Sequence, residues 1–133
     1  SCFMQDFALN PSMACFLDIE TAAAYYDAAM TLWTRSNELL PLNVHVVAYE
    51  DLVADPEAAL RSVVDFLGLD WSALMLDHRA TAKGRSGIAT PSYNQVIQPL
   101  TRAPIGRWKR YEKQLERVLP VLLPWAEQLG YRG

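Results

Sequence analysis

A single apolar run, Val44-His-Val-Val-Ala-Tyr49, limits the folds open to this sequence more than any other feature. A nearly continuous β-branched run of this length is typical of a strand buried on both faces of a parallel sheet. One strand cannot pair its own edges, and the other apolar residues of the chain follow a helical period. We therefore expect an α/β fold in which this chain is mostly α-helical with one strong strand at about residues 44–49, while the neighbouring strands lie elsewhere.

The length and the first residues of the chain are consistent with the expectation that the neighbouring strands lie outside it. The 133 residues suffice for one compact domain but not for two, and they begin with Ser1 rather than with an initiator methionine. We therefore expect residues 1–133 to be the C-terminal portion of one larger domain. The missing sheet edges also leave room for self-association.

Composition predicts a globular protein of a reducing compartment. No apolar run approaches the roughly 20 residues of a membrane span, and the first residues lack the basic and apolar regions of a signal peptide. Cysteine occurs only as Cys2 and Cys15, which favours a cytoplasmic protein over a disulfide framework. His45 and His78 are far apart in the sequence and no soft ligands gather near the cysteines, so we expect no metal site.

Charge is distributed unevenly along the chain. Residues 1–78 carry twelve acidic and two basic side chains, whereas residues 79–117 carry nine basic and two acidic ones. Such a concentration of like charges either builds a field for an anionic partner or decorates a solvated face. The glycine, proline and tryptophan residues among the basic ones favour an anion-binding loop, since a solvated helix needs none of them. The acidic first half argues against nucleic acid as the partner, because it repels a phosphate backbone.

Two long helices are predicted from their capping residues. Asp18 is expected to cap a helix over about residues 19–40. Asp55 and Pro56 are expected to begin a helix that ends before Gly68. In the first of these helices, apolar residues at helical spacing predict a buried stripe that consists of Ala22, Tyr25, Tyr26, Ala29, Leu32, Trp33 and Leu40.

The second half of the chain is predicted to contain shorter elements. Asp70 is expected to cap a short helix, and residues 79–91 lack an apolar period and are expected to form a loop. Gly106 is expected to open a helix that continues to the residues before Pro120. Pro120 is expected to begin a last helix that Gly130 closes.

The segment Thr101-Arg-Ala-Pro-Ile-Gly-Arg-Trp-Lys-Arg-Tyr111 contains four cationic side chains in eleven residues. Two prolines flank Arg102 and restrict its loop, so its guanidinium group is placed to bind a phosphate with two parallel hydrogen bonds. Gly106 would let backbone N–H groups approach an anion closely. We expect Trp108 to anchor this loop in the core.

Five segments of the chain occur together in one order. They are Ser-Cys-Phe-Met-Gln-Asp-Phe at positions 1–7, Tyr49-Glu-Asp-Leu-Val-Ala-Asp-Pro56, Phe66-Leu-Gly-Leu69, Thr90-Pro-Ser-Tyr-Asn-Gln-Val96 and Gly106-Arg-Trp-Lys-Arg-Tyr111. In this order and spacing the chain resembles the C-terminal half of sulfotransferases that use 3′-phosphoadenosine 5′-phosphosulfate, a family with a P-loop-type α/β fold. The resemblance is to bacterial members fused to tetratricopeptide repeats and, more distantly, to tyrosylprotein sulfotransferases.

The resemblance implies a set of nucleotide-binding residues. Ser1 matches a serine that holds the 3′-phosphate, Tyr49 matches the residue that contacts adenine, and the Gly-x-Trp-Lys element matches the loop that closes on the 3′-phosphate. Thr90 and Ser92 are added as donors to the cofactor or the acceptor. The residues expected at the cofactor are therefore Ser1, Tyr49, Thr90, Ser92, Arg102, Gly106, Arg107, Trp108 and Lys109.

The chain departs from the family pattern in two ways. No glycine-rich strand-to-helix turn of the P-loop kind occurs, and the general base of the family lies upstream, so no catalytic residue is assigned. Cytosolic members have adjacent Arg-Lys-Gly in the closing loop, whereas Arg102 here is followed by Ala103. The missing donors would be backbone N–H groups or Arg107.

The resemblance thus implies that the parent protein transfers a sulfuryl group from 3′-phosphoadenosine 5′-phosphosulfate to a hydroxyl or amine, without a metal. This chain would form the adenine and 3′-phosphate side of the site, and alone it would be inactive. The acceptor is left open between a sugar, a peptide tyrosine, a lipid and a small alcohol. Half of a P-loop kinase and a non-enzymatic helical interaction module are the alternatives.

Overall fold

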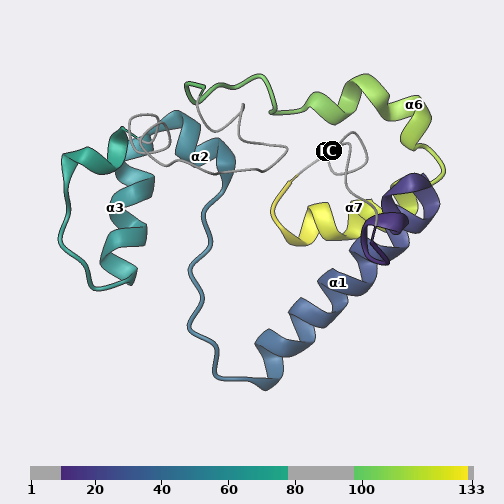
Figure 1. Ribbon diagram of the computed structural model, residues 1–133, viewed down its shortest axis with the longest axis horizontal. Helices are drawn as coiled ribbons and strands as arrows, with labels where there is room; N and C mark the ends of the chain where they lie inside the picture. Colours follow the sequence, from purple (N-terminus) through teal and green to yellow (C-terminus); the bar gives the residue numbers. More distant parts are fainter. Residues whose placement is uncertain (1–9, 78–97, 132–133) are drawn as a thin grey trace. The chain divides into compact units, whose positions relative to one another are not determined.

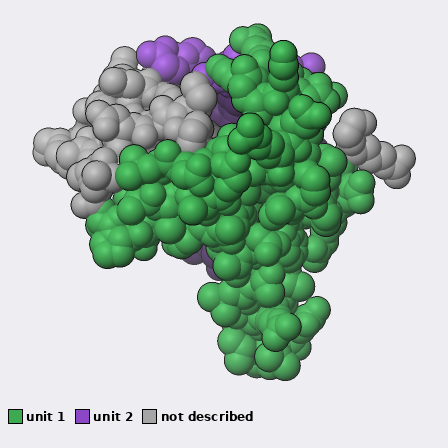
Figure 2. Space-filling view, turned by 90° about the vertical axis from the view of Figure 1, so that its right-hand side faces the viewer, with its two compact units in different colours: residues 1–42, 108–133 green, residues 43–107 purple. Residues whose placement is uncertain are grey.

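The computed structural model describes residues 10–77 and 98–131 of the chain. The residues fall into two compact units, each of which is considered by itself (Figure 1 and Figure 2). Unit 1 consists of residues 1–42 and 108–133, and unit 2 consists of residues 43–107. In the described residues every regular element is helical.

Unit 1 is built on the long helix α1, Ile19–Leu39. It begins where the sequence predicts, because the Asp18 carboxylate accepts a hydrogen bond of 2.9 Å from the backbone N–H of Thr21. A short 3-10 helix, η2 (Met13–Leu17), precedes it and packs against it. The C-terminal helix α7, Leu119–Gln128, also packs against α1.

The core of unit 1 joins the two ends of the chain. Ala23 of α1 and Val118, just before α7, are buried. The indole Nε1 of Trp125 donates a hydrogen bond of 2.7 Å to the carboxylate of Asp27, 98 residues away in the sequence. Because a bond to a charged acceptor is stronger than one between neutral groups, this contact fixes how α7 lies on α1.

The prediction that the large apolar residues of the α1 stripe are buried is wrong. Tyr25, Tyr26, Leu32, Trp33 and Leu40 are all among the exposed apolar side chains. Helical spacing identifies an apolar stripe but not its partner. Among the described elements of unit 1, η2 and α7 pack on α1, and the α1 residue that becomes buried is Ala23. Tyr25 makes a T-shaped ring contact with Phe16 of η2, with the centroids 5.8 Å apart, and stays exposed.

Unit 2 contains α2 (Tyr49–Ala54), α3 (Pro56–Phe66) and the 3-10 helix η3 (Ala73–Leu76). The prediction for α3 is confirmed: Asp55 accepts a hydrogen bond of 3.0 Å from the backbone N–H of Ala58, and Gly68 has a φ of +66° just beyond the helix. The short helix expected after Asp70 is a 3-10 turn that Ser72 caps. The loop expected at residues 79–91 lies outside the described residues.

The predicted strand at residues 44–49 is not a strand in the structure. Residues 43–48 are extended but have no paired neighbour among the described residues, and Tyr49 is already the first residue of α2 (Figure 1). A strand requires a ladder of hydrogen bonds to a second segment, which β-propensity cannot supply. Glu50 and Asp51 follow directly, and their negative charges favour a helix N-terminus at this point.

The single helix expected between Gly106 and Pro120 is divided. The segment forms the 3-10 helix η4 (Arg107–Tyr111) and one turn of α-helix, α6 (Glu112–Leu115), before α7 begins. Proline has no N–H and its ring collides with the carbonyl four residues earlier, so Pro120 disfavours a helix that continues through residues 116–120. The expectation that Pro120 lies at the start of the last helix, with Gly130 after its end, is confirmed.

Candidate functional site

Six of the nine residues predicted at the cofactor are described. Ser1, Thr90 and Ser92 lie outside the described residues. Tyr49, Arg102, Gly106 and Arg107 belong to unit 2, whereas Trp108 and Lys109 belong to unit 1. The residues that unit 2 places together are therefore the ones from which a site is built.

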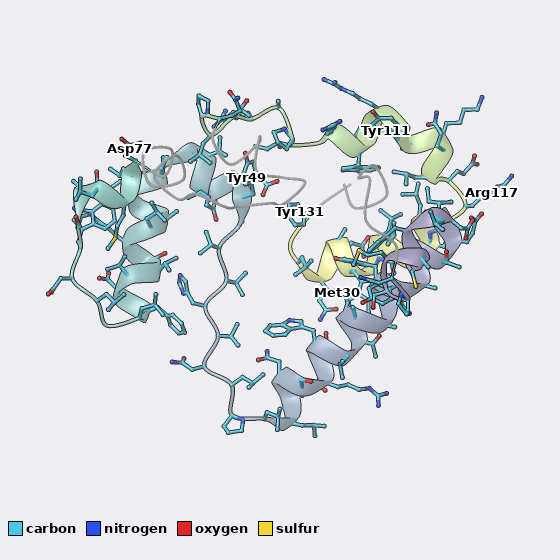
Figure 3. The ribbon with its side chains drawn as sticks, in the orientation of Figure 1. Met30, Tyr49, Asp77, Tyr111, Arg117 and Tyr131 are labelled. Carbon is cyan, nitrogen blue, oxygen red and sulfur yellow. The ribbon has the colours of Figure 1, made fainter. Side chains whose placement is uncertain are left out.

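Tyr49, which is labelled in Figure 3, contacts the basic loop, residues 101–107. The helix start at residue 49 places its phenol on the first turn of α2, and its hydroxyl donates a hydrogen bond of 2.9 Å to the backbone carbonyl of Thr101. The two residues are 52 positions apart, and the Tyr49 side chain is 36% exposed. The N-terminus of α2 and the beginning of the loop thus lie next to each other.

The loop from residue 101 to residue 107 is held by its own hydrogen bonds. The Thr101 hydroxyl accepts one of 3.2 Å from the N–H of Ala103, and the carbonyl of Arg102 accepts one of 3.0 Å from the N–H of Ile105. Gly106 has a φ of +67°, which side chains with a Cβ rarely adopt. The loop is therefore a series of defined turns.

The cations of this loop have no acidic partner among the described residues. Neither Arg102 nor Arg107 forms a described ion pair, and the N–H of Gly106 donates no described hydrogen bond. A guanidinium group binds phosphate oxygens in pairs, and a free backbone N–H adds a further donor. The donor set of this loop therefore fits an anion such as a phosphate.

Trp108 does not anchor the loop in a core. Its side chain is 39% exposed, and Lys109 lies over its ring with the Nζ atom 5.8 Å from the ring centroid. An aromatic residue in a basic segment presents an apolar surface, but burial depends on which element packs against it. The prediction of an anchor is wrong.

A hollow of about 290 Å³ in unit 2 is lined by none of the predicted site residues. Val46 and Val47 form one wall, and the junction of α2 with α3, including Asp51 and Asp55, forms the other. Two carboxylates repel a phosphate, so this hollow does not suit the anion that the loop fits. Within residues 10–77 and 98–131, no group of three or more possible ligands is arranged to hold a metal ion.

His45 lies at the edge of unit 2 and has partners of its own. Its Nε2 atom lies 3.1 Å from the Ser62 hydroxyl, and its ring stacks on Phe66 with the centroids 5.2 Å apart. These contacts tie the extended segment to α3.

Sequence reasoning missed the part that Thr101 plays. Its hydroxyl caps the first turn of the loop and its carbonyl accepts from Tyr49. The first of these bonds has a sequence signal, since threonine hydroxyls often accept from the N–H two residues on. The second has none, because a contact over 52 residues depends on the tertiary structure.

Comparison with protein families gives a match to the sulfotransferase family over residues 1–73, which is more than half of the chain. The chain therefore belongs to the sulfotransferase family. The match includes Tyr49 and α2 but not the basic loop. No helix in the described parts of the chain is long and apolar enough to cross a membrane.

Three relatives illustrate the similarity. Protein-tyrosine sulfotransferase 1 of Danio rerio is 27% identical over 121 residues, which cover 80% of this chain and 33% of the relative. Protein-tyrosine sulfotransferase 2 of Gallus gallus is 32% identical over 90 residues, covering 64% of this chain and 24% of the relative. An uncharacterised protein of Aquifex aeolicus is 25% identical over 121 residues, covering 90% of this chain and 16% of the relative. The chain thus spans a third or less of these relatives, and no solved structure matches it.

Proposed function

We propose that this member of the sulfotransferase family is part of an enzyme that transfers a sulfuryl group from 3′-phosphoadenosine 5′-phosphosulfate to a hydroxyl or amine acceptor. In this proposal the chain forms the adenine and 3′-phosphate side of the nucleotide site. The observation that carries it is the hydrogen bond of 2.9 Å between Tyr49 and Thr101, which joins the start of α2 to the basic loop. Arg102, without an acidic partner among the described residues, then supplies the charge for the 3′-phosphate.

The proposed reaction is a displacement at sulfur. The acceptor oxygen or nitrogen attacks the sulfur atom while the bond from sulfur to the 5′-phosphate oxygen breaks, and the electron pair of that bond goes to the phosphate. The acceptor proton goes to a base outside this chain. Positioning of the two reactants and stabilisation of the charge on the leaving phosphate lower the barrier. The part of this chain is to hold the leaving nucleotide.

The extended segment 43–48 supports the proposal that the P-loop half of the domain lies elsewhere in the parent protein. Val46 is 75% exposed, although such a residue is ordinarily buried in a sheet. Strands from the P-loop half would pair with this segment and cover it. The chain's coverage of a third or less of its relatives agrees with this arrangement.

The test compares two nucleotides on the full-length protein. We expect 3′-phosphoadenosine 5′-phosphate to bind more tightly than adenosine 5′-monophosphate, by calorimetric titration. Arg102→Ala should weaken binding of the first nucleotide about tenfold or more, since a hydrogen bond to a charged group contributes roughly 1.5–3 kcal/mol and each 1.4 kcal/mol is about tenfold.

Lys113→Ala is the matched control, because Lys113 is an exposed cation on α6, outside the loop. It should change the affinity little. Equal effects of the two substitutions would instead indicate a general attraction to a basic surface. A Mg²⁺-dependent preference for ATP would contradict the proposal in favour of a kinase.

The acceptor that we propose is a tyrosine hydroxyl in a peptide. The support is the similarity of the chain to two relatives that are protein-tyrosine sulfotransferases. Transfer from a labelled donor to a tyrosine peptide, and none to the same peptide with phenylalanine, is the expected result. Transfer to a sugar or lipid in place of the peptide would overturn this choice and leave the nucleotide site unaffected.

A further inference from the structure

We infer that Tyr49 is a positioning residue whose hydroxyl fixes the basic loop 101–107, rather than a residue that reads the nucleotide through that hydroxyl. The effect of this bond on the loop stands on the geometry alone. Its effect on nucleotide binding rests on the proposed function. The two parts are therefore tested separately.

The Tyr49 hydroxyl has one proton, and the structure shows where it goes. The proton is donated to the Thr101 carbonyl over 2.9 Å, and that oxygen has none to donate in return. The phenol oxygen is left with only its acceptor capacity. Since phosphate oxygens and the ring nitrogens of adenine are also acceptors, the hydroxyl cannot donate to them while this contact is intact. Of the nucleotide, only the adenine amino group and the ribose hydroxyls could donate to it.

The hydrogen bond from Tyr49 to the Thr101 carbonyl attaches the first residue of the loop to α2. The turns that follow are closed by bonds within the loop, from the N–H of Ala103 to the Thr101 hydroxyl, from Ile105 to Arg102, and from Arg107 to the carbonyl of Pro104 at 3.1 Å. These bonds fix the shape of the loop but not its position on unit 2. Among the described side chains, Tyr49 is the one that hydrogen-bonds this loop to a distant element.

The helix that begins with Tyr49, α2, is positioned by its packing against α3. Tyr49 is the first residue of α2, and α2 packs against α3 through the junction that Asp55 caps. A guanidinium group on a loop fixed to these helices binds with a smaller loss of conformational entropy than one on a loose loop. The bond of Tyr49 therefore preorganises Arg102 for an anion.

The first test measures the loop without any nucleotide. In the full-length protein, Tyr49→Phe removes the hydroxyl and keeps the ring, and we expect amide hydrogen exchange at Ala103, Ile105 and Arg107 to become about fivefold faster, the effect of losing one hydrogen bond. Exchange at Leu122 of α7 should stay unchanged, which shows that the variant is folded. Unchanged exchange in the loop would overturn the inference.

The control is Tyr26→Phe. Tyr26 lies on α1 with similar exposure and has no described hydrogen bond from its hydroxyl, so its loss should leave the loop unchanged. Faster exchange of the loop in this variant as well would show a general effect of removing a tyrosine hydroxyl, and would count against the specific role of Tyr49.

The second test separates positioning from direct contact. Tyr49→Phe should lower the affinity for 3′-phosphoadenosine 5′-phosphate about fivefold, leave that for adenosine 5′-monophosphate unchanged, and have no further effect in an Arg102→Ala background. Equal losses for both nucleotides would indicate contact with the base and overturn the inference. If Tyr49→Phe loosens the loop while the unmodified protein shows no preference for the 3′-phosphate, the positioning role is supported and the proposed function fails.

Discussion

The two units of this chain are stabilised in different ways. Unit 1 is closed by contacts between its ends, with Trp125 of α7 bonded to Asp27 of α1 and Val118 buried to 2% exposure. In unit 2, hydrogen-bonded caps and turns hold the segments, such as Asp55 at the start of α3 and Thr101 at the start of the basic loop. Its one buried apolar residue among those described is Val64.

This difference has a functional consequence. The residues that fit an anion, Arg102 and Gly106, lie in unit 2, on a loop that the Tyr49 hydroxyl hydrogen-bonds to α2. Regions with few buried contacts open more easily, and binding segments are commonly drawn from them. Unit 1 is the place where loss of packing should be most costly, and unit 2 the place where loss of a single polar contact should have a local effect.

The largest expected effect is in unit 1. Val118→Ala removes two buried methyl groups and should lower the free energy of unfolding by about 2 kcal/mol. Urea denaturation measures the loss, and hydrogen exchange should become faster in α1 and α7. Val46→Ala, at an exposed position in unit 2, is the control and should change stability little. Equally faster exchange at Ala59 of α3 in the Val118 variant would remove the distinction between the units.

A smaller effect is expected in the basic loop of unit 2. Gly106→Ala forces a side chain into a φ of +67°, which costs roughly 1–2 kcal/mol, while no atom lies within 4 Å of the added Cβ. The loss should therefore come from the backbone, and exchange in residues 103–107 should rise while α7 is unaffected. Gly106→Asn should recover part of the loss, because asparagine tolerates this conformation better. Identical behaviour of the two variants would contradict this explanation.

The smallest effect concerns the start of α1. The backbone N–H of Thr21, the largest influence, lowers the pKa of the Asp18 carboxyl below its ordinary value. The cap should therefore contribute stability above about pH 4, where this carboxyl is ionised in both states, and lose it as the pH falls through the lowered pKa. The protection factors for amide exchange at Thr21 and Ala22, which correct for the intrinsic pH dependence of exchange, measure this loss when they are followed from pH 5 to pH 2.5 by nuclear magnetic resonance.

Asp18→Asn is the matched variant for that titration. Its side chain still caps a helix but does not ionise, so the acid-induced change at Thr21 should disappear. A change of the same size in both proteins would assign the effect to other groups. Because this cap is local to α1, the protection of amides in α3 of unit 2 should not change when Asp18 is protonated.

The predictions from sequence succeeded where a few neighbouring residues decide the structure. The caps at Asp18 and Asp55 and the positive φ of Gly68 are confirmed, because each depends on residues within one helical turn. The predictions failed where the structure depends on contact with a second segment of the chain. Residues 44–48 have the composition of a strand but no segment to pair with among those described, and the tyrosines of α1 have an apolar period but stay exposed.

The candidate site was predicted in the same uneven way. Arg102 and Gly106 were selected from their own segment, by charge and by turn chemistry. Tyr49 was selected by resemblance, with a role in contacting adenine that stays a prediction. Its bond to Thr101 could not be predicted, because nothing in either segment specifies the other.

The sequence by itself determined the starts of α1 and α3, the glycine that follows α3 and the family, since these depend on local backbone energetics and on motifs in order. Only the tertiary structure decided that Trp125 meets Asp27 and that Tyr49 holds the loop of Arg102. The physical reason is that the free energy of such contacts comes from bringing distant segments together. That gain appears only after the entropy cost of closing the intervening chain has been met.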